Sequence, residues 1–178
     1  MSAATKPEGR AEPLARERGQ YLTFLLGSEV FAVDILRIRE IIEYGAITAV
    51  PTMPEFIRGV INLRGSVVPI VDLAARFGRK ASPVTRRTCM VIIEAGTDAE
   101  NQMLGIVVDS VSAVVDIPGA DIAPPPAFGA KVRASFISGM GKVNGGFVIM
   151  LDLNRVLSVD EIATLADAGA GQVLAEAA

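Results

Sequence analysis

Histidine and tryptophan are absent from this chain of 178 residues, and cysteine occurs once. Without histidine the chain cannot build a Ser-His-Asp triad or a His metal site, and it lacks the commonest general base. Cys89 cannot form an intramolecular disulfide, and inside the strand-like run TCMVIIEA it is expected to act as a small core residue. These absences argue against enzymes that depend on histidine or on an activated thiol.

Long apolar segments are missing as well. Apolar runs such as residues 104–108 and 147–151 span about five residues, whereas a membrane-crossing helix needs roughly twenty. The net charge is only −3, and the basic residues, Arg86-Arg87 included, form no stripe with interleaved aromatics. Neither membrane insertion nor nucleic-acid binding is therefore expected. The first residues hold no apolar stretch that could serve as a signal peptide, so we expect a cytoplasmic protein.

The chain contains an internal repeat. Residues 56–73 (FIRGVINLRGSVVPIVDL) return eighty residues later as residues 136–153 (FISGMGKVNGGFVIMLDL). Upstream of each copy lies a second, weaker match, between residues 30–34 (VFAVD) and residues 105–109 (GIVVD). Each copy reads as strand, tight turn, strand and then a carboxylate that opens a helix. Short strands with such frequent turns favour two small closed β units of about five strands each over one open sheet.

The two copies differ at the turn of the hairpin. Asn144-Gly145 suits a two-residue type I′ turn, because both central residues need positive φ and Asn and Gly tolerate it best. The first copy has Arg64-Gly65 at the same place, although arginine gains nothing from a left-handed backbone. Arg64 is therefore either a solvated turn residue or a contact residue, and the sequence leaves both interpretations open.

Aspartates follow the predicted strands in both halves. Asp72 and Asp152 precede LAARF and LNRVL, which favours helix N-caps over the proton-sharing pair of an aspartic protease, since neither lies in an Asp-Thr-Gly or Asp-Ser-Gly loop. Asp34 and Asp109, at the ends of the two upstream strands, raise the same question of cap or ligand, and a cap is favoured for Asp34. Asp34 precedes ILRIREIIE, whose isoleucines at i, i+3 and i+7 predict a short helix or helical turn. The charge and apolar surface of that segment also make it a plausible docking surface.

The ends of the chain differ in composition from its middle. Both ends lack periodicity and are expected to be disordered, and Ser158 can cap a closing helix before the C-terminal tail. The boundary between the two β units is placed in the polar, basic link of residues 78–88. The predicted limits are 1–19 for the N-terminal tail, about 20–80 for the first barrel, about 86–157 for the second barrel, about 158–166 for the closing helix and 167–178 for the C-terminal tail.

The chain resembles the CheW family of bacterial chemotaxis coupling proteins in four segments: VDILRIREII, FIRGVINLRGSVVPIVDL, GIVVDSVSAV and ISGMG...FVIMLDL. The likeness covers about residues 20–166, and NLRG followed by VPIVDL is its most specific part. The resemblance implies a mainly β fold of two five-stranded, SH3-like barrels around a shared apolar interior, with short helices. It also implies an adaptor without catalytic activity and without a cofactor.

The resemblance further implies the partners. CheW-like proteins bridge the cytoplasmic tip of methyl-accepting chemoreceptors to the regulatory domain of the histidine kinase CheA, and they are monomers that join receptor arrays. The alternatives are a regulator of a non-flagellar pathway and a sensor of small molecules in the inter-barrel cleft, although that cleft would be mostly aliphatic. For the aliphatic candidates, plain core packing is the competing interpretation. The partner-binding positions implied by matching segments are Ile38, Glu40, Ile41, Gly59, Arg64, Val111 and Val114.

Overall fold

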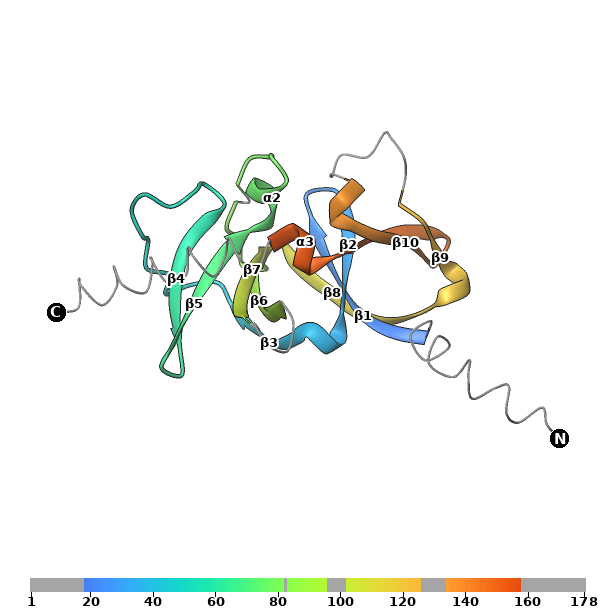
Figure 1. Cartoon of the computed structure of the whole chain (residues 1–178), viewed down its shortest axis with the longest axis horizontal. Helices are drawn as coiled ribbons and strands as arrows, with labels where there is room; N and C mark the ends of the chain where they lie inside the picture. Colours follow the sequence, from blue (N-terminus) through green and yellow to red (C-terminus); the bar gives the residue numbers. More distant parts are fainter. Residues whose placement is uncertain (1–17, 82, 96–101, 126–133, 158–178) are drawn as a thin grey trace.

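The computed structural model describes residues 18–81, 83–95, 102–125 and 134–157, which form two β lobes side by side (Figure 1). In spatial order, the five-stranded sheet consists of β3 (Ile38–Glu43), β6 (Cys89–Ala95), β7 (Gln102–Val108), β5 (Ser66–Asp72) and β4 (Ile57–Leu63). The six-stranded sheet consists of β8 (Ser110–Pro118), β1 (Arg18–Leu26), β2 (Glu29–Asp34), β11 (Gly146–Leu151), β10 (Ile137–Val143) and β9 (Ile122–Ala123). The described helices are short, namely α2 (Leu73–Arg76), α3 (Leu153–Leu157) and the 3-10 turns η2 (Ile35–Arg37), η4 (Gly119–Asp121) and η5 (Ala134–Phe136).

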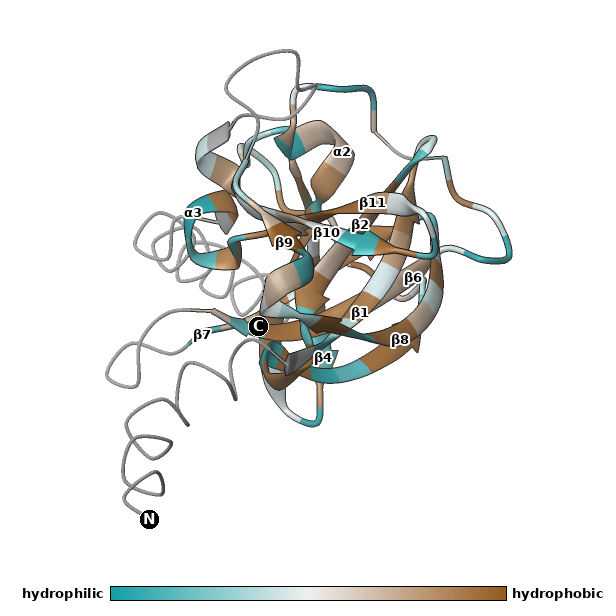
Figure 2. Cartoon of the chain, turned by 90° about the vertical axis from the view of Figure 1, so that its right-hand side faces the viewer, coloured by the Kyte–Doolittle hydropathy of each residue, from teal (hydrophilic) through white to brown (hydrophobic). Residues whose placement is uncertain are grey.

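The two sheets repeat one arrangement, which confirms the mainly β fold and the duplication. In each sheet an antiparallel hairpin, β6–β7 or β1–β2, lies beside the repeated hairpin, β5–β4 or β11–β10. The contact between the two hairpins is parallel in both sheets, through β7 and β5 in one and through β2 and β11 in the other. Figure 2 shows the strands of the six-stranded lobe curling round one another, with apolar residues along much of their length.

The lobes differ from the prediction in the segments that they combine. We expected residues 20–80 to form one barrel and residues 86–157 the other. Instead, β1 and β2 lie in the lobe of β8–β11, and β6 and β7 lie in the lobe of β3–β5. A parallel pair needs a long crossover connection, and the segment that contains β6 supplies it between β5 and β7. Each repeated hairpin therefore pairs with the upstream strand of the opposite half.

The first strand also begins earlier than predicted. Arg18 and Gly19, which we assigned to the N-terminal tail, open β1 and pair with β8. The other predictions for the chain ends lie outside the described residues: the remainder of the N-terminal tail at 1–17, the closing helix at 158–166 and the C-terminal tail at 167–178.

Both repeated hairpins turn with a left-handed backbone, as the sequence predicted. Asn144 and Gly145 have φ values of 52° and 82°, and Arg64 and Gly65 have values of 52° and 89°. Positive φ at both central residues is what a type I′ turn requires. The Asn62 side chain supports the first turn by accepting a hydrogen bond from the Gly65 amide at 2.8 Å. Arg64 thus occupies a conformation that residues other than Gly and Asn rarely adopt.

A glycine in each repeated hairpin lets a neighbouring segment come close. Gly59 has a φ of +147°, and a Cβ atom there would lie 2.2 Å from the Thr48 carbonyl oxygen. Thr48 forms an isolated bridge with Val60, with N···O distances of 2.8 and 2.9 Å. Gly139 stands at the same place in the second copy, where β9 pairs with β10. The repeated glycine is therefore required by the close approach of a third chain segment.

The repeated aspartates cap helices, as predicted. Asp72 accepts a hydrogen bond from the Ala75 amide at 3.1 Å at the start of α2. Asp152 accepts one from the Arg155 amide at 3.3 Å at the start of α3. Caps of this kind stabilise a helix by about 1 kcal/mol.

Asp34 caps a helical turn, as predicted, but the isoleucine spacing that carried this pattern as far as Ile42 does not produce a helix beyond Arg37. The Asp34 carboxylate accepts a hydrogen bond from the Leu36 amide at 2.9 Å, and η2 then ends. From Ile38 onwards the chain forms strand β3, in which half-buried and exposed residues alternate. The apolar and charged residues of this segment fit either period, and pairing with β6 imposes the period of two.

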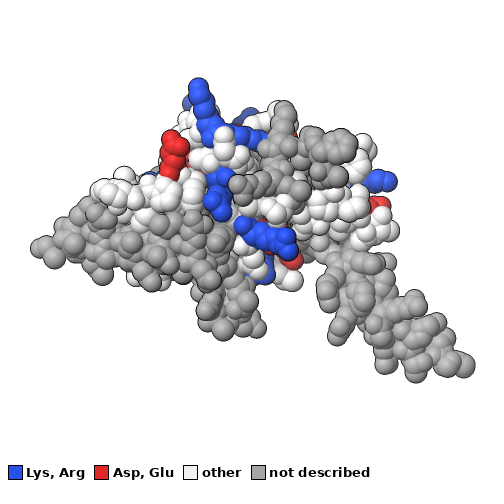
Figure 3. All heavy atoms as spheres, turned by 45° about the horizontal axis from the view of Figure 1, so that its top comes forward, with Lys and Arg blue, Asp and Glu red and all other residues white. Residues whose placement is uncertain are grey.

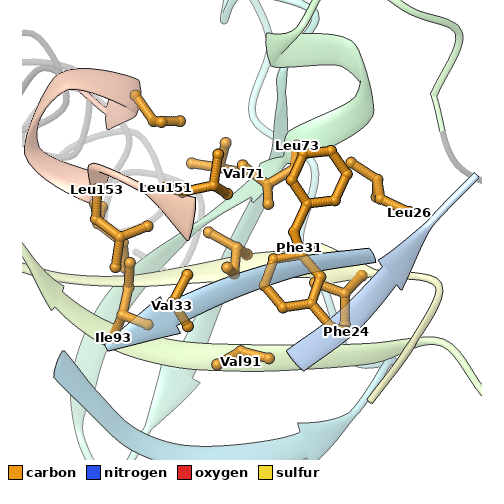
Figure 4. Packing of buried hydrophobic residues seen from close by; sticks show 14 of the residues in the cluster. Phe24, Leu26, Phe31, Val33, Val71, Leu73, Val91, Ile93, Leu151 and Leu153 are labelled. Atoms are coloured by element: carbon orange, nitrogen blue, oxygen red, sulfur yellow. The ribbon is translucent and has the colours of Figure 1, made fainter. Parts of the chain in front are cut away.

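A shared apolar core joins the two lobes (Figure 4). Phe24 and Phe31 reach it from the six-stranded sheet and stack with 5.9 Å between their ring centroids. Val71, Val91 and Ile93 reach it from the five-stranded sheet. Each lobe also has a smaller apolar cluster of its own. Separating the lobes would expose the shared cluster to water, so they behave as one folded unit.

Equivalent residues of the two copies meet where α2 approaches α3. Arg76 Nε donates a hydrogen bond to the Val156 carbonyl oxygen at 2.6 Å, and the two residues are 80 positions apart, as are the repeats. The Arg76 guanidinium also lies 4.7 Å and 5.5 Å from the ring centroids of Phe56 and Phe136, which open the two copies. The approximate two-fold axis of the duplication therefore runs close to this contact.

The surface shown in Figure 3 carries basic side chains in separate groups, with uncharged atoms between them. Over the residues that the structure describes, no helix combines the length and the apolar character needed to cross a bilayer.

Candidate partner-binding site

Glu40 and Arg64, two of the predicted partner-binding residues, form an ion pair on the five-stranded lobe. Arg64 lies at the tip of the β4–β5 hairpin, and Glu40 lies on β3. Arg64 Nη1 donates to Glu40 Oε2 at 2.5 Å, and Nη2 donates to Oε1 at 3.1 Å. Strands β3 and β4 are opposite edges of the sheet, so the pair links edges that the curl of the sheet brings together.

Arg64 is exposed and Glu40 is half-buried, and both residues keep their charges. Hydrogen bonding from Arg64 lowers the pKa of the Glu40 carboxyl below its ordinary value, and the same bond raises the pKa of the Arg64 guanidinium. The Arg64 side chain is 73% exposed, and exposed pairs contribute little to stability. The fork geometry nevertheless holds a planar cation in one orientation at the surface. Such a group can contact a partner with little further loss of side-chain freedom.

Ile38, Ile41 and Gly59 have different roles in the same sheet. Ile38 is half-buried and packs against the shared core, whereas Ile41 is 43% exposed. Successive strand residues point to opposite faces, so Ile41 and Glu40 lie on different faces of β3. Gly59 is buried and allows the approach of Thr48, so it shapes β4 and offers no side chain to a partner.

Val111 and Val114 lie on β8, in the other lobe. Val111 is half-buried and packs against the shared core, whereas Val114 is 49% exposed. Of the aliphatic candidates, Ile41 and Val114 therefore offer the most apolar surface to a partner, and Ile38 and Val111 also serve the core. The structure joins Glu40 to Arg64 directly and distributes the other candidates over two sheets.

An ion pair that the sequence analysis missed lies beneath the first hairpin. Arg58 Nε and Nη2 donate to Asp72 Oδ2 at 2.8 and 2.6 Å, and Arg58 Nη1 donates to the Tyr44 hydroxyl at 2.8 Å. Burial opposes the charge of Arg58, but its hydrogen bonds to Asp72 and Tyr44 and their charges outweigh burial and raise the pKa of the guanidinium. Asp72 is fully buried. Arg58 lies at the irregular step of the β4–β5 register and has no residue directly opposite it, so strand pairing read from the sequence would not have revealed this pair.

A hollow of about 200 Å³ lies on the six-stranded lobe, and two of the residues that line it, Leu151 and Leu153, also belong to the shared core. The inter-lobe core is instead filled by apolar side chains, as Figure 4 shows. Within the described ranges, no three His, Cys, Asp or Glu side chains gather as a metal ion would require. Cys89 is half-buried, and burial, followed by the charge of Glu43, raises the pKa of its thiol. The polar side chains that line the hollow are Tyr21, Asp34, Arg37, Ser138, Asp152 and Asn154.

Comparison with known proteins places this arrangement in a family. The family model described as the CheW-like domain matches residues 20–161. This chain belongs to the CheW family. A solved structure of the scaffolding protein TtCheW from Thermoanaerobacter tengcongensis superposes with a TM-score of 0.71 at 31% identity, covering 79% of this chain and 88% of that one. The two lobes are accordingly the SH3-like subdomains that the resemblance implied.

CheW relatives match most of the chain in sequence. The chemotaxis protein CheW of Klebsiella aerogenes is 34% identical over 144 residues, which cover 81% of this chain and 84% of the relative. The chemotaxis protein CheW of Rhizobium meliloti is 32% identical over 151 residues, which cover 85% of this chain and 95% of the relative. The CheW-like match begins inside β1 and spans both sheets, so it includes the Glu40–Arg64 pair and the β8 valines.

Proposed function

We propose that this protein is a non-catalytic adaptor that couples methyl-accepting chemoreceptors to the histidine kinase CheA in chemotaxis signalling. Membership of the CheW family supports an adaptor role, and one solved relative is described as a scaffolding protein. The observation that carries the proposal is the Glu40–Arg64 pair, which holds an exposed cation in a left-handed turn where a smaller residue would suit the backbone better.

The proposed contact surface consists of the ion pair together with the exposed apolar residues Ile41 and Val114. In such an interface the exposed aliphatic side chains of Ile41 and Val114 supply apolar contact and affinity, and the charge of the pair supplies orientation. The expected partners are the cytoplasmic tip of the receptor and the regulatory domain of CheA. The adaptor would act in the cytoplasm as a monomer until it joins receptor and kinase in an array.

Sedimentation tests this proposal directly. Purified protein is mixed with a receptor signalling domain and CheA, and the fraction that sediments is measured together with kinase activity. Wild type should sediment with both partners and raise kinase activity. Arg64→Ala and Glu40→Lys should lower both readings without lowering the melting temperature, because the pair lies at the surface. If the charges face the partner, sedimentation of wild type should also decrease as ionic strength rises, because salt screens the charges. This decrease should be larger for wild type than for the two variants.

A charge swap and a matched control separate this surface from general surface charge. The double variant E40R/R64E restores the internal pair with reversed polarity, so it should keep the turn supported but fail to bind the partner. Arg39 offers the control, because it also lies on β3 and pairs with Glu94 at 2.9 Å while 58% exposed. Arg39→Ala should leave sedimentation unchanged. Normal coupling by both Arg64→Ala and Glu40→Lys would remove the pair from the proposed surface.

A further inference from the structure

The two copies of the repeat carry different residues at the position equivalent to Arg58, whose side chain contacts the capping aspartate. In the first copy this position is Arg58, whose guanidinium binds the Asp72 carboxylate with two hydrogen bonds and the Tyr44 hydroxyl with a third. The guanidinium also lies 5.4 Å from the centroid of the Tyr44 ring. One carboxylate and one tyrosine therefore form a guanidinium site, which the protein fills with its own arginine.

In the second copy the equivalent position is Ser138, eighty residues after Arg58. The backbone around it is the same: the Asp152 amide donates to the Phe136 carbonyl at 2.9 Å, as the Asp72 amide donates to the Phe56 carbonyl at 2.7 Å. The short Ser138 side chain turns back to the Met150 carbonyl, at 3.3 Å. The hollow of about 200 Å³ is lined by both Ser138 and Asp152.

The lining of the hollow reproduces the groups that surround Arg58. Asp152 supplies the carboxylate, and Tyr21 of β1 supplies a phenol. Asp34 adds a second carboxylate and Arg37 a cation, so the charged lining carries one net negative charge. Burial, followed by the charge of Asp34, raises the pKa of the Tyr21 hydroxyl.

Arg155 already contacts Asp152, but it would compete only weakly with a cation bound in the hollow. Arg155 lies 3.6 Å from Asp152 Oδ2 and is 68% exposed, so this pair is long and surrounded by water. Asp152 itself is 37% exposed, which leaves its carboxylate accessible from outside. The hollow is smaller than the about 300–1,000 Å³ of sites for drug-sized ligands. It therefore suits a group of the size of one side chain.

We propose that this hollow binds a guanidinium group, with Asp152 as its carboxylate partner and Tyr21 as its aromatic partner, as Asp72 and Tyr44 bind Arg58. A planar guanidinium matches a carboxylate through two parallel hydrogen bonds, which an ammonium cannot form. The guanidinium belongs either to a small free compound or to an arginine side chain of a bound protein. The site lies on the six-stranded lobe, whereas the Glu40–Arg64 pair lies on the five-stranded lobe.

Titration with N-acetyl-L-argininamide, followed by NMR, tests the site on the protein alone. Saturable shifts are expected at Tyr21, Ser138 and Asp152, and N-acetyl-L-lysinamide, with the same charge, should bind several-fold more weakly. Asp152→Asn keeps the cap but loses the charge, so binding should weaken about tenfold or more. Asp116→Asn changes an exposed carboxylate on β8 and should have no effect.

Ser138→Arg tests the same inference by restoring the arginine of the first copy. The new side chain should occupy the hollow, abolish binding of the argininamide and leave the melting temperature at or above that of wild type. Ser138→Ala is the matched control and should keep binding. The proposal is overturned if no saturable shifts appear near the hollow, or if binding persists equally in Ser138→Arg and Asp152→Asn.

A second arm identifies the source of the guanidinium and rests on the proposed adaptor function. Ser138→Arg and Ser138→Ala are compared in the sedimentation assay with receptor and CheA. Selective loss of one partner in Ser138→Arg, reproduced in wild type by excess argininamide, assigns the guanidinium to that partner. Unchanged sedimentation together with argininamide binding assigns it to a free compound. Failure of wild type to sediment at all would count against the adaptor function and leave the NMR result standing.

Discussion

Replacing Asp72 by Asn should destabilise the protein strongly, although the same change at Asp152 should not. Asn preserves the N-cap at both positions, so loss of the cap does not distinguish them. At position 72 the change removes the charge that compensates Arg58, whose side chain is only 19% exposed. Removal of one partner of a buried ion pair typically costs about 3–5 kcal/mol. We expect about 3 kcal/mol here, because Arg58 retains the Tyr44 hydroxyl and some contact with water.

Urea unfolding followed by far-UV circular dichroism measures this difference. For a protein of this size, about 3 kcal/mol corresponds to a melting temperature lower by about 10 °C. Asp152→Asn should cost less than about 1 kcal/mol, since its carboxylate is partly exposed and its arginine partner lies in water. The double variant Arg58→Met/Asp72→Leu should recover much of the loss, because it buries no unpaired charge. Equal small losses in Asp72→Asn and Asp152→Asn would refute this account of the buried pair.

Three further predictions concern the candidate surface. In NMR titrations the Glu40 carboxyl should titrate below its ordinary pKa, and Arg64→Ala should move this pKa back up. The contribution of the pair to stability is present above the ordinary pKa of 4.5 and is lost as the pH falls through the lower pKa of the folded protein. Identical titrations in the two proteins would contradict the pairing. Gly59→Ala should cost more than about 2 kcal/mol in urea unfolding, because it adds a clash to a left-handed backbone, and a loss under about 0.5 kcal/mol would disprove the close approach. Val114→Lys should keep the melting temperature and weaken sedimentation with the partners, because Val114 is exposed. Val111→Lys should lower the melting temperature, because Val111 packs against the shared core. A lower melting temperature for Val114→Lys than for Val111→Lys would show that their burial is misassigned.

Features that depend on local sequence were predictable. The offset of eighty residues identified two equivalent hairpins, and Asn144-Gly145 identified the turn that Arg64-Gly65 also adopts. The capping role of Asp72 followed from its place between a strand and an apolar run. In each case the residues that determine the structure lie within a few positions of one another, so a single sequence contains the whole signal.

Features that depend on distant pairing were not predictable in the same way. The spacing of isoleucines after Asp34 fits a helix, and only pairing with β6 makes Ile38–Glu43 a strand. Arg64 and Glu40 were both selected as candidates, but their direct contact depends on the curl of the sheet between its two edges. Each repeated hairpin pairs with the upstream strand of the opposite half, an arrangement that we call the exchange of hairpins. It leaves no trace in the local pattern, because pairing within one half or between the halves would bury the same apolar faces.

The exchange of hairpins also determines the order in which the protein can be completed during synthesis. Strands β1 and β2 leave the ribosome first, yet their neighbours β8 and β11 belong to the second half of the chain. Thr23, for example, bonds to Ala113, 90 residues later. Until then a two-stranded ribbon bearing Phe24 and Phe31 has no sheet to join and is exposed to mispairing with other chains. A fragment that ends in the link near residue 80 should therefore fail to fold, even though it contains one entire copy of the repeat.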